Sequence, residues 1–348
     1  MLQSKKSVIT YQNKLSLRGL KTDKCLLIFD KKLIQYPEAL KVIKKFPLRY
    51  GVQGGETLKD LKKFPAHVEK ILKILHKNNQ KDLTIIGFGG GSIGDFSGFF
   101  ASTFKRGVQL VFIPSTWLSA IDSSHGGKNG LNVAQFKNQI GTFYMAQTIY
   151  IARDILKHQP QPMMIDAAGE LFKIALIEGG KLWRQFQKLQ YSNEKQLWDI
   201  LPLAVRAKYQ IVQEDPTESN GYRQILNLGH TLGHVIEARL GVSHGAAVGQ
   251  GLVFATEWAY KMGFLGSNQY QMISRNLFYK HFYLSLRSSL ADLDRKKIET
   301  SLMMDKKKSQ KNDLYFIFPV RPGLCIRHNV KIKNILQATD ALKKKNYL

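Results

Sequence analysis

The chain has 348 residues, and a typical size of about 150 residues per domain predicts two domains. Its residues are 44% hydrophobic and 11% aromatic, which is enough to fill real cores and excludes intrinsic disorder for most of the chain. Lys and Arg number 52 and Asp and Glu number 26, so the formal net charge is +26. Such an excess attracts anions, whether a phosphorylated small molecule, nucleic acid or an acidic membrane surface, and charge alone does not choose among them.

The chain contains two cysteines, Cys25 and Cys325. This number excludes a disulfide framework and a cysteine-based zinc site, and it fits a reducing cytosol. No apolar run approaches the roughly 18 residues of a membrane helix, and the first residues lack the apolar core of a secretory signal. We therefore expect a cytoplasmic protein without a membrane partner.

Strand-like and helix-like segments alternate in the first half of the chain. Short apolar runs predict the strands, and helical spacing of apolar residues predicts the helices between them. The expected strands are 24–30, 82–88, 108–113 and 148–152, and the expected helices are 58–76 and 92–104. Such alternation is typical of a parallel sheet flanked by helices, so residues 1–159 are predicted to form a Rossmann-like α/β domain.

Long amphipathic patterns dominate the second half, after a Pro-rich stretch at 158–162. One β-like run, 314–318, interrupts them, and residues 343–348 are predicted to be a solvated end. The expected helices are 166–190, 195–213, 225–240, 245–263 and 268–283. Residues 160–348 are therefore predicted to form a mainly α-helical domain.

A glycine-rich turn follows the strand predicted at 82–88 and opens the next helix. Gly89, Gly90 and Gly91 let the backbone approach a ligand, and the N–H groups at a helix start attract phosphate. Asp95 suits the positive end of that helix. The spacing is not the usual G-x-G-x-x-G, so a nucleotide pyrophosphate site and a simple packing turn are equally supported.

A dense block of Asp, Ser, Lys and Asn residues, 121–132, follows the strand predicted at 108–113. Burying so many polar groups is costly unless each finds a partner, so a solvated loop is one interpretation. The block also lies beyond the carboxyl end of a predicted parallel strand, where open α/β sheets bind ligands. Its acid, lysines and amides suit the binding of hydroxyls and a phosphate.

His230 and His234 are four residues apart on a predicted helix and share one face. Glu170 lies on an earlier predicted helix, with Lys173 one turn further on. Two histidines, one carboxylate and an open position form a catalytic zinc set, and spacing alone makes His230 and His234 the ligands. The alternative, favoured without other information, is a hydrogen-bonded pair of core histidines with Glu170 on a solvated helix face.

Five segments together resemble the 3-dehydroquinate synthase family, and the similarity runs from about residue 24 to about residue 320. They are GGGSIGDFSGF (89–99), RGVQLVFIPSTWLSAIDSSHGGKNGLN (106–132), KNQIGTFY (137–144), GELFK (169–173) and LNLGHTLGHVIE (226–237). The resemblance implies a lyase of the shikimate pathway that uses NAD and zinc or cobalt to convert the keto-acid phosphate DAHP to 3-dehydroquinate and phosphate. It also implies that the first domain binds NAD and that the second binds metal and substrate.

The resemblance assigns residues by matching positions. By this matching the metal ligands are Glu170, His230 and His244, which replaces the pair chosen from spacing. His234 matches a residue beside the substrate phosphate. The implied cofactor-binding residues are Asp30, Glu56, Lys59, Gly89, Gly90, Gly91, Asp95, Ser115, Thr116, Asp122, Ser123, Lys128 and Lys137. The implied substrate-binding and catalytic residues are Arg106, Lys128, Asn138, Lys173, Lys208, Arg223, Asn227, His234 and Lys306. In the family, an arginine equivalent to Arg106 reaches the phosphate across a dimer interface, so we expect a homodimer.

The implied chemistry explains these residue types. NAD oxidises the C5 hydroxyl, phosphate leaves by β-elimination, the hydride returns, and ring opening and aldol closure follow. A metal chelated by the C4 and C5 hydroxyls polarises the ketone, while lysines and arginines bind the carboxylate and phosphate and orient the leaving group. The departing phosphate itself can take the proton, so no strong protein base is needed.

Several positions depart from the family pattern, and none of them removes a metal ligand. They are Lys32, Asn129, Arg153, Met163 and Ala246. Lys32 affects the expected NAD affinity, and Ala246 replaces the Glu of the usual H-G-E next to His244. The alternatives are a 2-deoxy-scyllo-inosose synthase, an oxidoreductase of the glycerol-dehydrogenase type, an inactive relative and, in a different class, a basic nucleic-acid-binding protein. We recognise no nucleic-acid-binding motif, so a small phosphorylated substrate is the expected partner.

Overall fold

The computed structural model describes residues 6–76, 82–134, 136–190, 193–304 and 313–344. The chain divides into two compact units, Met1–Met163 and Met164–Leu348. The predicted site residue Lys306 and residues 345–348 of the predicted solvated end lie outside the described residues. In the described ranges, no helix is both long enough and apolar enough to cross a bilayer.

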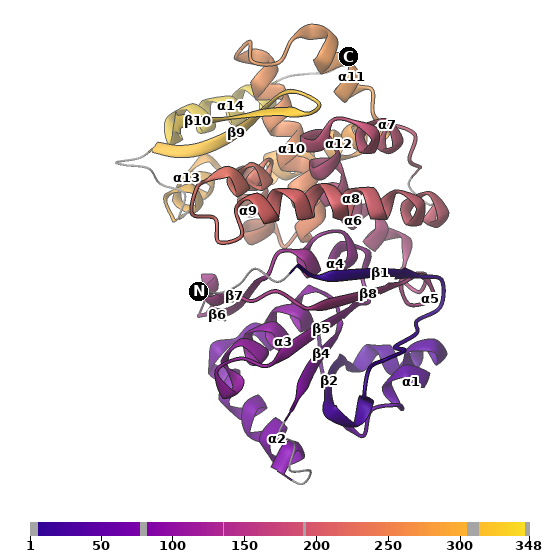
Figure 1. Ribbon diagram of the computed structural model, residues 1–348. Coiled ribbons are helices and arrows are strands. Elements are labelled where there is room, and N and C mark those ends of the chain that lie inside the picture. The colour runs from indigo at the N-terminus through magenta and orange to yellow at the C-terminus, as the bar shows by residue number, and fades with distance from the viewer. Residues whose placement is uncertain (1–5, 77–81, 135, 191–192, 305–312, 345–348) are drawn as a thin grey trace. The chain divides into compact units, whose positions relative to one another are not determined.

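The first unit is built on a six-stranded parallel sheet with the order β1-β8-β5-β4-β2-β3 (Figure 1). Its strands are β1 (Val8–Gln12), β2 (Cys25–Asp30), β3 (Leu48–Val52), β4 (Thr84–Gly89), β5 (Gln109–Pro114) and β8 (Thr148–Ala152). The predicted α/β fold class and all four predicted strands are confirmed. The strands β1 and β3 were not predicted, because VITYQ and LRYGV are short runs that mix polar and apolar residues.

Helices cover both faces of this sheet. They are α1 (Pro37–Ile43), α2 (Phe64–His76), α3 (Gly91–Thr103), α4 (Trp117–Ile121) and α5 (Arg153–Leu156). Along β4, Ile86 and Phe88 point into the core shared with α1 and α5. Gly87 points to α3 instead, where an added Cβ would meet Ser97. Both faces of β4 are therefore buried, which explains its continuous apolar run.

The predicted helix 58–76 begins only at Phe64. The residues before it form two 3-10 helices, η3 (Glu56–Lys59) and η4 (Leu61–Lys63). Pro65 lies in the first turn of α2, where a missing backbone N–H is tolerated. The other 3-10 helices of this unit are η1 (Thr22–Lys24), η2 (Lys31–Gln35), η5 (Phe104–Arg106) and η6 (Ser123–His125).

The strand order switches direction between β2 and β4. From β2 the chain moves outward to β3 and then returns to the opposite side of β2 to form β4. Open parallel sheets bind ligands at the carboxyl ends of the strands beside such a switch. Asp30 ends β2 and Gly89 ends β4, so two predicted cofactor-binding positions lie at this edge.

An antiparallel hairpin, which was not predicted, begins in the polar block and consists of β6 (Lys128–Val133) and β7 (Phe136–Phe143). The strand β6 packs on α3, where the absence of a Cβ at Gly98 leaves room for the side chain of Asn129. The buried amide of Asn129 donates to the carbonyl oxygens of Gly127 and Tyr144, each at 3.0 Å. This departure from the family pattern therefore holds the hairpin in place.

The second unit is mainly helical, as predicted. Its helices are α6 (Gln161–Glu178), which spans the boundary, α7 (Lys181–Phe186), α8 (Glu194–Glu214), η7 (Tyr222–Asn227), α9 (His230–Leu240), α10 (His244–Lys261), α11 (Ser267–Ser274), α12 (Leu277–Asp292), α13 (Arg295–Met303) and α14 (Ile332–Lys344). Two strands, β9 (Asp313–Arg321) and β10 (Leu324–Lys331), form an antiparallel hairpin.

Two predicted helices are each divided into two. The segment 166–190 breaks at Gly179, whose φ of +70° ends α6. The segment 268–283 breaks at Asn276, whose side chain accepts from the N–H of Phe278 at 2.9 Å and caps α12. The predicted helix 225–240 is likewise interrupted, because Gly229 adopts a φ of +80° between η7 and α9.

The helices α6 and α10 form the centre of the second unit. Residues 167–177 of α6 and 247–259 of α10 are buried without interruption. A helix that is buried all round belongs to the interior of its domain. The charged residues Glu170 and Lys173 on α6 therefore lie in an apolar environment, where each needs a partner.

Candidate metal centre and nucleotide-binding turn

The candidate metal centre is assembled where α6, α9 and α10 touch through their backbones. At the crossing of α6 and α10, an added Cβ on Gly169 would overlap the carbonyl oxygen of Gly245. At the crossing of α9 and α10, an added Cβ on Gly251 would overlap the carbonyl oxygen of Gly229. Glycine is the residue that permits such approaches. The three helices are therefore close enough for their side chains to share one ligand.

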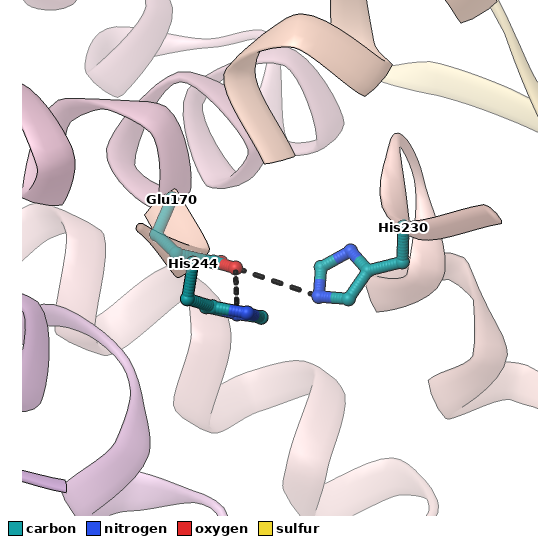
Figure 2. Close-up of side chains that lie close together, drawn as sticks. All are labelled: Glu170, His230 and His244. Atoms are coloured by element: carbon teal, nitrogen blue, oxygen red, sulfur yellow. Dashed lines mark ion pairs between the residues drawn. The ribbon is translucent and has the colours of Figure 1, made fainter. Parts of the chain in front are cut away.

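Figure 2 shows Glu170, His230 and His244 pointing toward one another. Oε1 of Glu170 lies 3.4 Å from Nε2 of His230 and 3.2 Å from Nε2 of His244, and the three ligand atoms all lie within 4.8 Å of one another. Ligands at about 2.1 Å from a tetrahedral zinc ion are separated by about 3.4 Å. The two measured separations fit corners of one tetrahedron, and three protein ligands leave the fourth corner to an exchangeable ligand, as in catalytic zinc sites.

Glu170 is fully buried, with 0% of its surface exposed. Burial by itself raises the pKa of the carboxyl, but Lys173 and His244 outweigh burial and hold this pKa well below its usual range. Lys173 forms an ion pair with Oε2, so Oε1 is left to face the histidines. A buried, ionised carboxylate with one oxygen directed at two imidazole nitrogens fits a cation ligand.

His244 uses both nitrogens of its ring. Nε2 faces Glu170, and Nδ1 lies 3.0 Å from Oε2 of Glu237 on α9. Burial lowers the pKa of the imidazole, but the two carboxylates raise it to about 10. A carboxylate on the second ring nitrogen typically fixes the orientation of a metal-binding histidine.

Glu237 was missed by sequence reasoning, although a signal was present. It follows His230 by seven residues, which places it two turns further along the same helix face. The sequence had raised the question of what supports His244 when Ala246 replaces an acidic residue. Glu237 provides the carboxylate, and Asp166 accepts from the N–H of Ala246 at 2.9 Å.

A second group, His234, Glu237 and His244, also has its ligand atoms within 4.8 Å of one another. It differs from the first in burial, because His234 is exposed whereas Glu170 is fully buried. The pair chosen from spacing, His230 and His234, belongs to no common group among the described residues, and their rings meet edge to face at 5.1 Å. Spacing therefore identified the correct face of α9. It did not reveal that α6 and α10 supply the other two residues of the group, Glu170 and His244.

Two other predicted substrate residues of the second unit are buried, and a third precedes the ligand His230 in the chain. Lys208 is buried on α8, and Arg223 is buried in η7. The guanidinium of Arg223 donates to the carbonyl oxygen of Pro216 at 2.8 Å, and its backbone N–H donates to Asp215 at 3.1 Å. Asn227 ends η7 just before His230.

The glycine-rich turn of the first unit begins a helix that has no side-chain cap. The helix α3 begins at Gly91, and its N-cap residue Gly90 provides no side-chain hydrogen bond. Added Cβ atoms would lie 3.1 Å from Thr116 at Gly90 and 3.2 Å from Ser123 at Gly91, so the turn is packed against the segment that follows β5. Uncapped N–H groups at a helix start attract a phosphate. Three predicted cofactor-binding segments thus meet: the turn itself, Thr116 and Ser123.

Several other predicted site residues of the first unit lie near the sheet edge, between short helices or on the surface. Asp30 accepts from the N–H groups of Lys32 at 3.1 Å and Gly54 at 3.4 Å, and the N–H of Ser115 donates to the carbonyl of Gly89 at 2.9 Å. Asp122 lies between α4 and η6. The cationic residues Arg106, Lys128 and Lys137 are exposed.

Four predicted site residues form one polar cluster in the first unit. The ammonium group of Lys59 lies 2.6 Å from Oδ2 of Asp95, 2.6 Å from Oδ1 of Asn138 and 4.0 Å from Oε1 of Glu56. The contact with Asn138 links η3 to the hairpin β6–β7, and the contact with Asp95 links it to α3. The structure therefore brings these four residues together, although they are up to 82 positions apart in the sequence.

Comparison with known proteins identifies relatives over most of the chain. Residues 49–166 match the family described as 3-dehydroquinate synthase N-terminal, and residues 167–308 match its C-terminal counterpart. A 3-dehydroquinate synthase of Alkaliphilus oremlandii is 35% identical over 312 residues, covering 87% of this chain and 84% of that protein.

Two solved structures have a similar fold. A 2-epi-5-epi-valiolone synthase from Streptomyces hygroscopicus, solved with NAD+ and Zn2+ bound, has a TM-score of 0.82 at 19% identity and covers 99% of each chain. A 2-deoxy-scyllo-inosose synthase complexed with carbaglucose-6-phosphate, NAD+ and Co2+ has a TM-score of 0.79 at 22% identity and covers 97% of this chain and 96% of that one. At these identities the likeness concerns the fold.

Proposed function

This chain belongs to the 3-dehydroquinate synthase family, and we propose from this premise that it converts DAHP to 3-dehydroquinate and phosphate. It is then a carbon–oxygen lyase of the shikimate pathway. The observation that carries the proposal is the cluster of Glu170, His230 and His244, whose separations suit one divalent cation and which lies in the matched C-terminal region.

Glu170, His230 and His244 would hold the metal, for which we propose zinc or cobalt. Imidazole and carboxylate are donors that suit both ions. When bound, such an ion polarises substrate oxygens and lowers the pKa of a hydroxyl. Lys173 contributes by keeping the carboxyl of Glu170 ionised despite complete burial, so this ligand is ready to bind a cation.

The uncapped start of α3 would bind the pyrophosphate of NAD. The N–H groups after Gly90 lack a side-chain cap, and Thr116 and Ser123 line the same turn. When bound, NAD supplies reversible hydride transfer, so the overall reaction is redox-neutral. The other residues assigned to this cofactor by the family pattern are Asp30, Glu56, Lys59, Asp95, Ser115, Asp122, Lys128 and Lys137.

Basic residues would bind the carboxylate and phosphate of the substrate. Lys173, Lys208 and Arg223 are buried, and a charge in such surroundings interacts strongly with a ligand anion. Holding both anionic ends orients the C–H bond and the leaving phosphate, and positioning of this kind supplies much of the rate. The family pattern adds Arg106, Lys128, Asn138, Asn227, His234 and Lys306 to this set.

We further propose a cytoplasmic homodimer that binds neither nucleic acid nor membranes. The role of Arg106 in the family, which reaches across a dimer interface, motivates the dimer, and the exposure of Arg106 is compatible with it. Light scattering combined with size exclusion tests the dimer. In a gel-shift assay at low salt, we expect the protein to leave the mobility of nucleic acid unchanged.

The test of the main proposal is incubation of the protein with DAHP, NAD and zinc. We expect stoichiometric release of phosphate and 3-dehydroquinate without net accumulation of NADH. Glu170→Gln should abolish turnover, and Glu299→Gln, which removes the same charge from α13 of the same unit, should not. Folded, metal-loaded protein that releases no phosphate from DAHP would refute the proposal. A substrate panel that includes glucose 6-phosphate distinguishes the proposed activity from that of an inosose synthase.

A further inference from the structure

One face of α9 carries three side chains that can bind metals. His230, His234 and Glu237 follow one another at intervals of four and three residues, a spacing that places side chains on the same face of a helix. His230 belongs to the ligand set of the metal centre, together with Glu170 and His244. His234 and Glu237 lie further along this face and form the second group of possible ligands with the same His244.

The imidazole of His244 lies between the two groups. Its Nε2 is 3.2 Å from Oε1 of Glu170, and its Nδ1 is 3.0 Å from Oε2 of Glu237. The ring is rigid and its two nitrogens point in different directions, so each nitrogen faces a different carboxylate. An imidazole in this arrangement can bind one cation through each nitrogen.

The second group contains the donor types that zinc prefers. The ligand atoms of His234, Glu237 and His244 lie within 4.8 Å of one another, and the two imidazole rings have centroids 6.2 Å apart. Two imidazoles and one carboxylate are also the donors of the first group, and three protein ligands leave a further position to water. His234 is exposed and the other two side chains are partly buried, so ions in solution can reach this group.

We propose that His234, Glu237 and His244 form a second cation position, in which Nδ1 of His244 binds one ion while Nε2 binds the ion of the first group. The second ion replaces the direct contact between His244 and Glu237. Solvent screens the attraction between an ion and an exposed group, so the second position binds more weakly than the first, which contains the fully buried Glu170. Rising zinc therefore fills the first position before the second.

A filled second position inhibits turnover. The family pattern places His234 beside the substrate phosphate, and an imidazole nitrogen that binds an ion no longer donates a hydrogen bond or exchanges a proton. Turnover should therefore fall over the same range of free zinc in which the second ion binds. This consequence rests on the proposed function, whereas the binding of the second ion does not.

The first test counts ions without using the reaction. Wild-type protein is equilibrated with buffers of increasing free zinc, and the zinc bound per chain is measured by mass spectrometry. We expect one ion at low and two at high free zinc, whereas His234→Ala should keep the first ion and lose the second. His328→Ala, which removes an exposed histidine from β10 of the same unit, should still bind two ions. A wild type that binds only one ion overturns the proposal, as does a second ion that remains in His234→Ala.

The second test asks whether the two ions share the ring of His244. Cobalt(II) replaces zinc, because imidazole and carboxylate bind both ions. Two cobalt ions joined through one imidazole interact magnetically, so the electron paramagnetic resonance signal per bound cobalt should fall when the second ion binds. In His234→Ala this signal should stay constant as cobalt is raised. A second bound cobalt that leaves the signal per ion unchanged contradicts the shared ring.

The third test measures the release of phosphate from DAHP as free zinc increases. Wild-type turnover should fall as the second ion binds, and the remaining turnover of His234→Ala should not respond to the same increase. Wild-type turnover that persists when the second position is filled refutes the inhibition. Wild-type protein that releases no phosphate at any zinc concentration refutes the proposed function, and the ion count then decides the second position independently.

Discussion

Removal of the Glu237 carboxylate should weaken metal binding without removing a metal ligand. Oε2 of Glu237 lies 3.0 Å from Nδ1 of His244, and that contact directs Nε2 toward Glu170, 3.2 Å away. Loss of such an outer partner typically costs about 10- to 100-fold in metal affinity, which corresponds to about 1.4–2.7 kcal/mol. In Glu237→Gln an amide oxygen still accepts from Nδ1, so we expect the lower end of this range. In Glu237→Ala the ring loses its partner, so we expect the upper end.

The assay is competition for zinc with a chelator of known affinity, followed by the metal content of the protein after dialysis. Glu299→Gln is the control, because it also removes one carboxylate from a helix of the second unit and should leave the zinc affinity unchanged. Circular dichroism checks that each variant is folded. Zinc affinities of Glu237→Gln and Glu237→Ala equal to that of the wild type would refute the reasoning. An affinity lost completely in both would mean that Glu237 is itself a ligand, as the group of His234, Glu237 and His244 allows.

Zinc at a hundredfold excess over its Kd should stabilise the native protein by about 2.7 kcal/mol, and a melting temperature that does not respond to zinc would contradict the proposed metal centre. Gly169→Ala should destabilise the fold and abolish zinc binding, because its Cβ would overlap the Gly245 carbonyl. The control is Gly266→Ala, since an added Cβ there meets nothing within 4 Å. Thermal unfolding compares the two variants. A hydrogen bond from Lys157 is the main cause that lowers the pKa of Glu38 from 4.5 to about 2, and a backbone hydrogen bond and His158 lower it further. A carboxyl whose pKa is lower in the folded state stabilises the fold at pH values above its unfolded-state pKa. This stabilisation is lost as the pH falls through the folded-state pKa. Urea unfolding should therefore find Glu38→Gln less stable than the wild type near neutral pH, with the difference shrinking toward zero as the pH falls below about 2. A difference that does not shrink as the pH falls would disprove this.

The metal centre shows which part of a site can be predicted from spacing. A helical interval of four residues placed His230 and His234 on one face, and the structure agrees that both lie near the centre. Spacing within one helix does not reveal which other helix crosses it. His244 and Glu170 join the cluster because of contacts between glycine backbones, and these contacts leave no periodic pattern. Only the family resemblance supplied the ligand set of Glu170, His230 and His244.

The fold shows a similar limit. Buried parallel strands were predicted because both of their faces are apolar, as in β4 and β5. The hairpin β6–β7 was not, because β7 is exposed along most of its length and β6 is rich in polar residues. Helix periodicity continued across Gly179 and Asn276, where a positive φ and a side-chain cap divide the helices. In each case the missing information was a tertiary contact or a local backbone angle.

The crossings of α6, α9 and α10 through bare glycine backbone have a consequence for how this centre can evolve. Where helices are spaced by side chains, a smaller or larger residue can shift them and so adjust the span between ligands. Here main-chain atoms are already in contact, so no substitution can draw the helices closer, and any added side chain forces them apart. Changes in metal preference are therefore expected to arise from the charges and hydrogen bonds around the ligands, such as Lys173 and Glu237, while the ligand spacing stays constant.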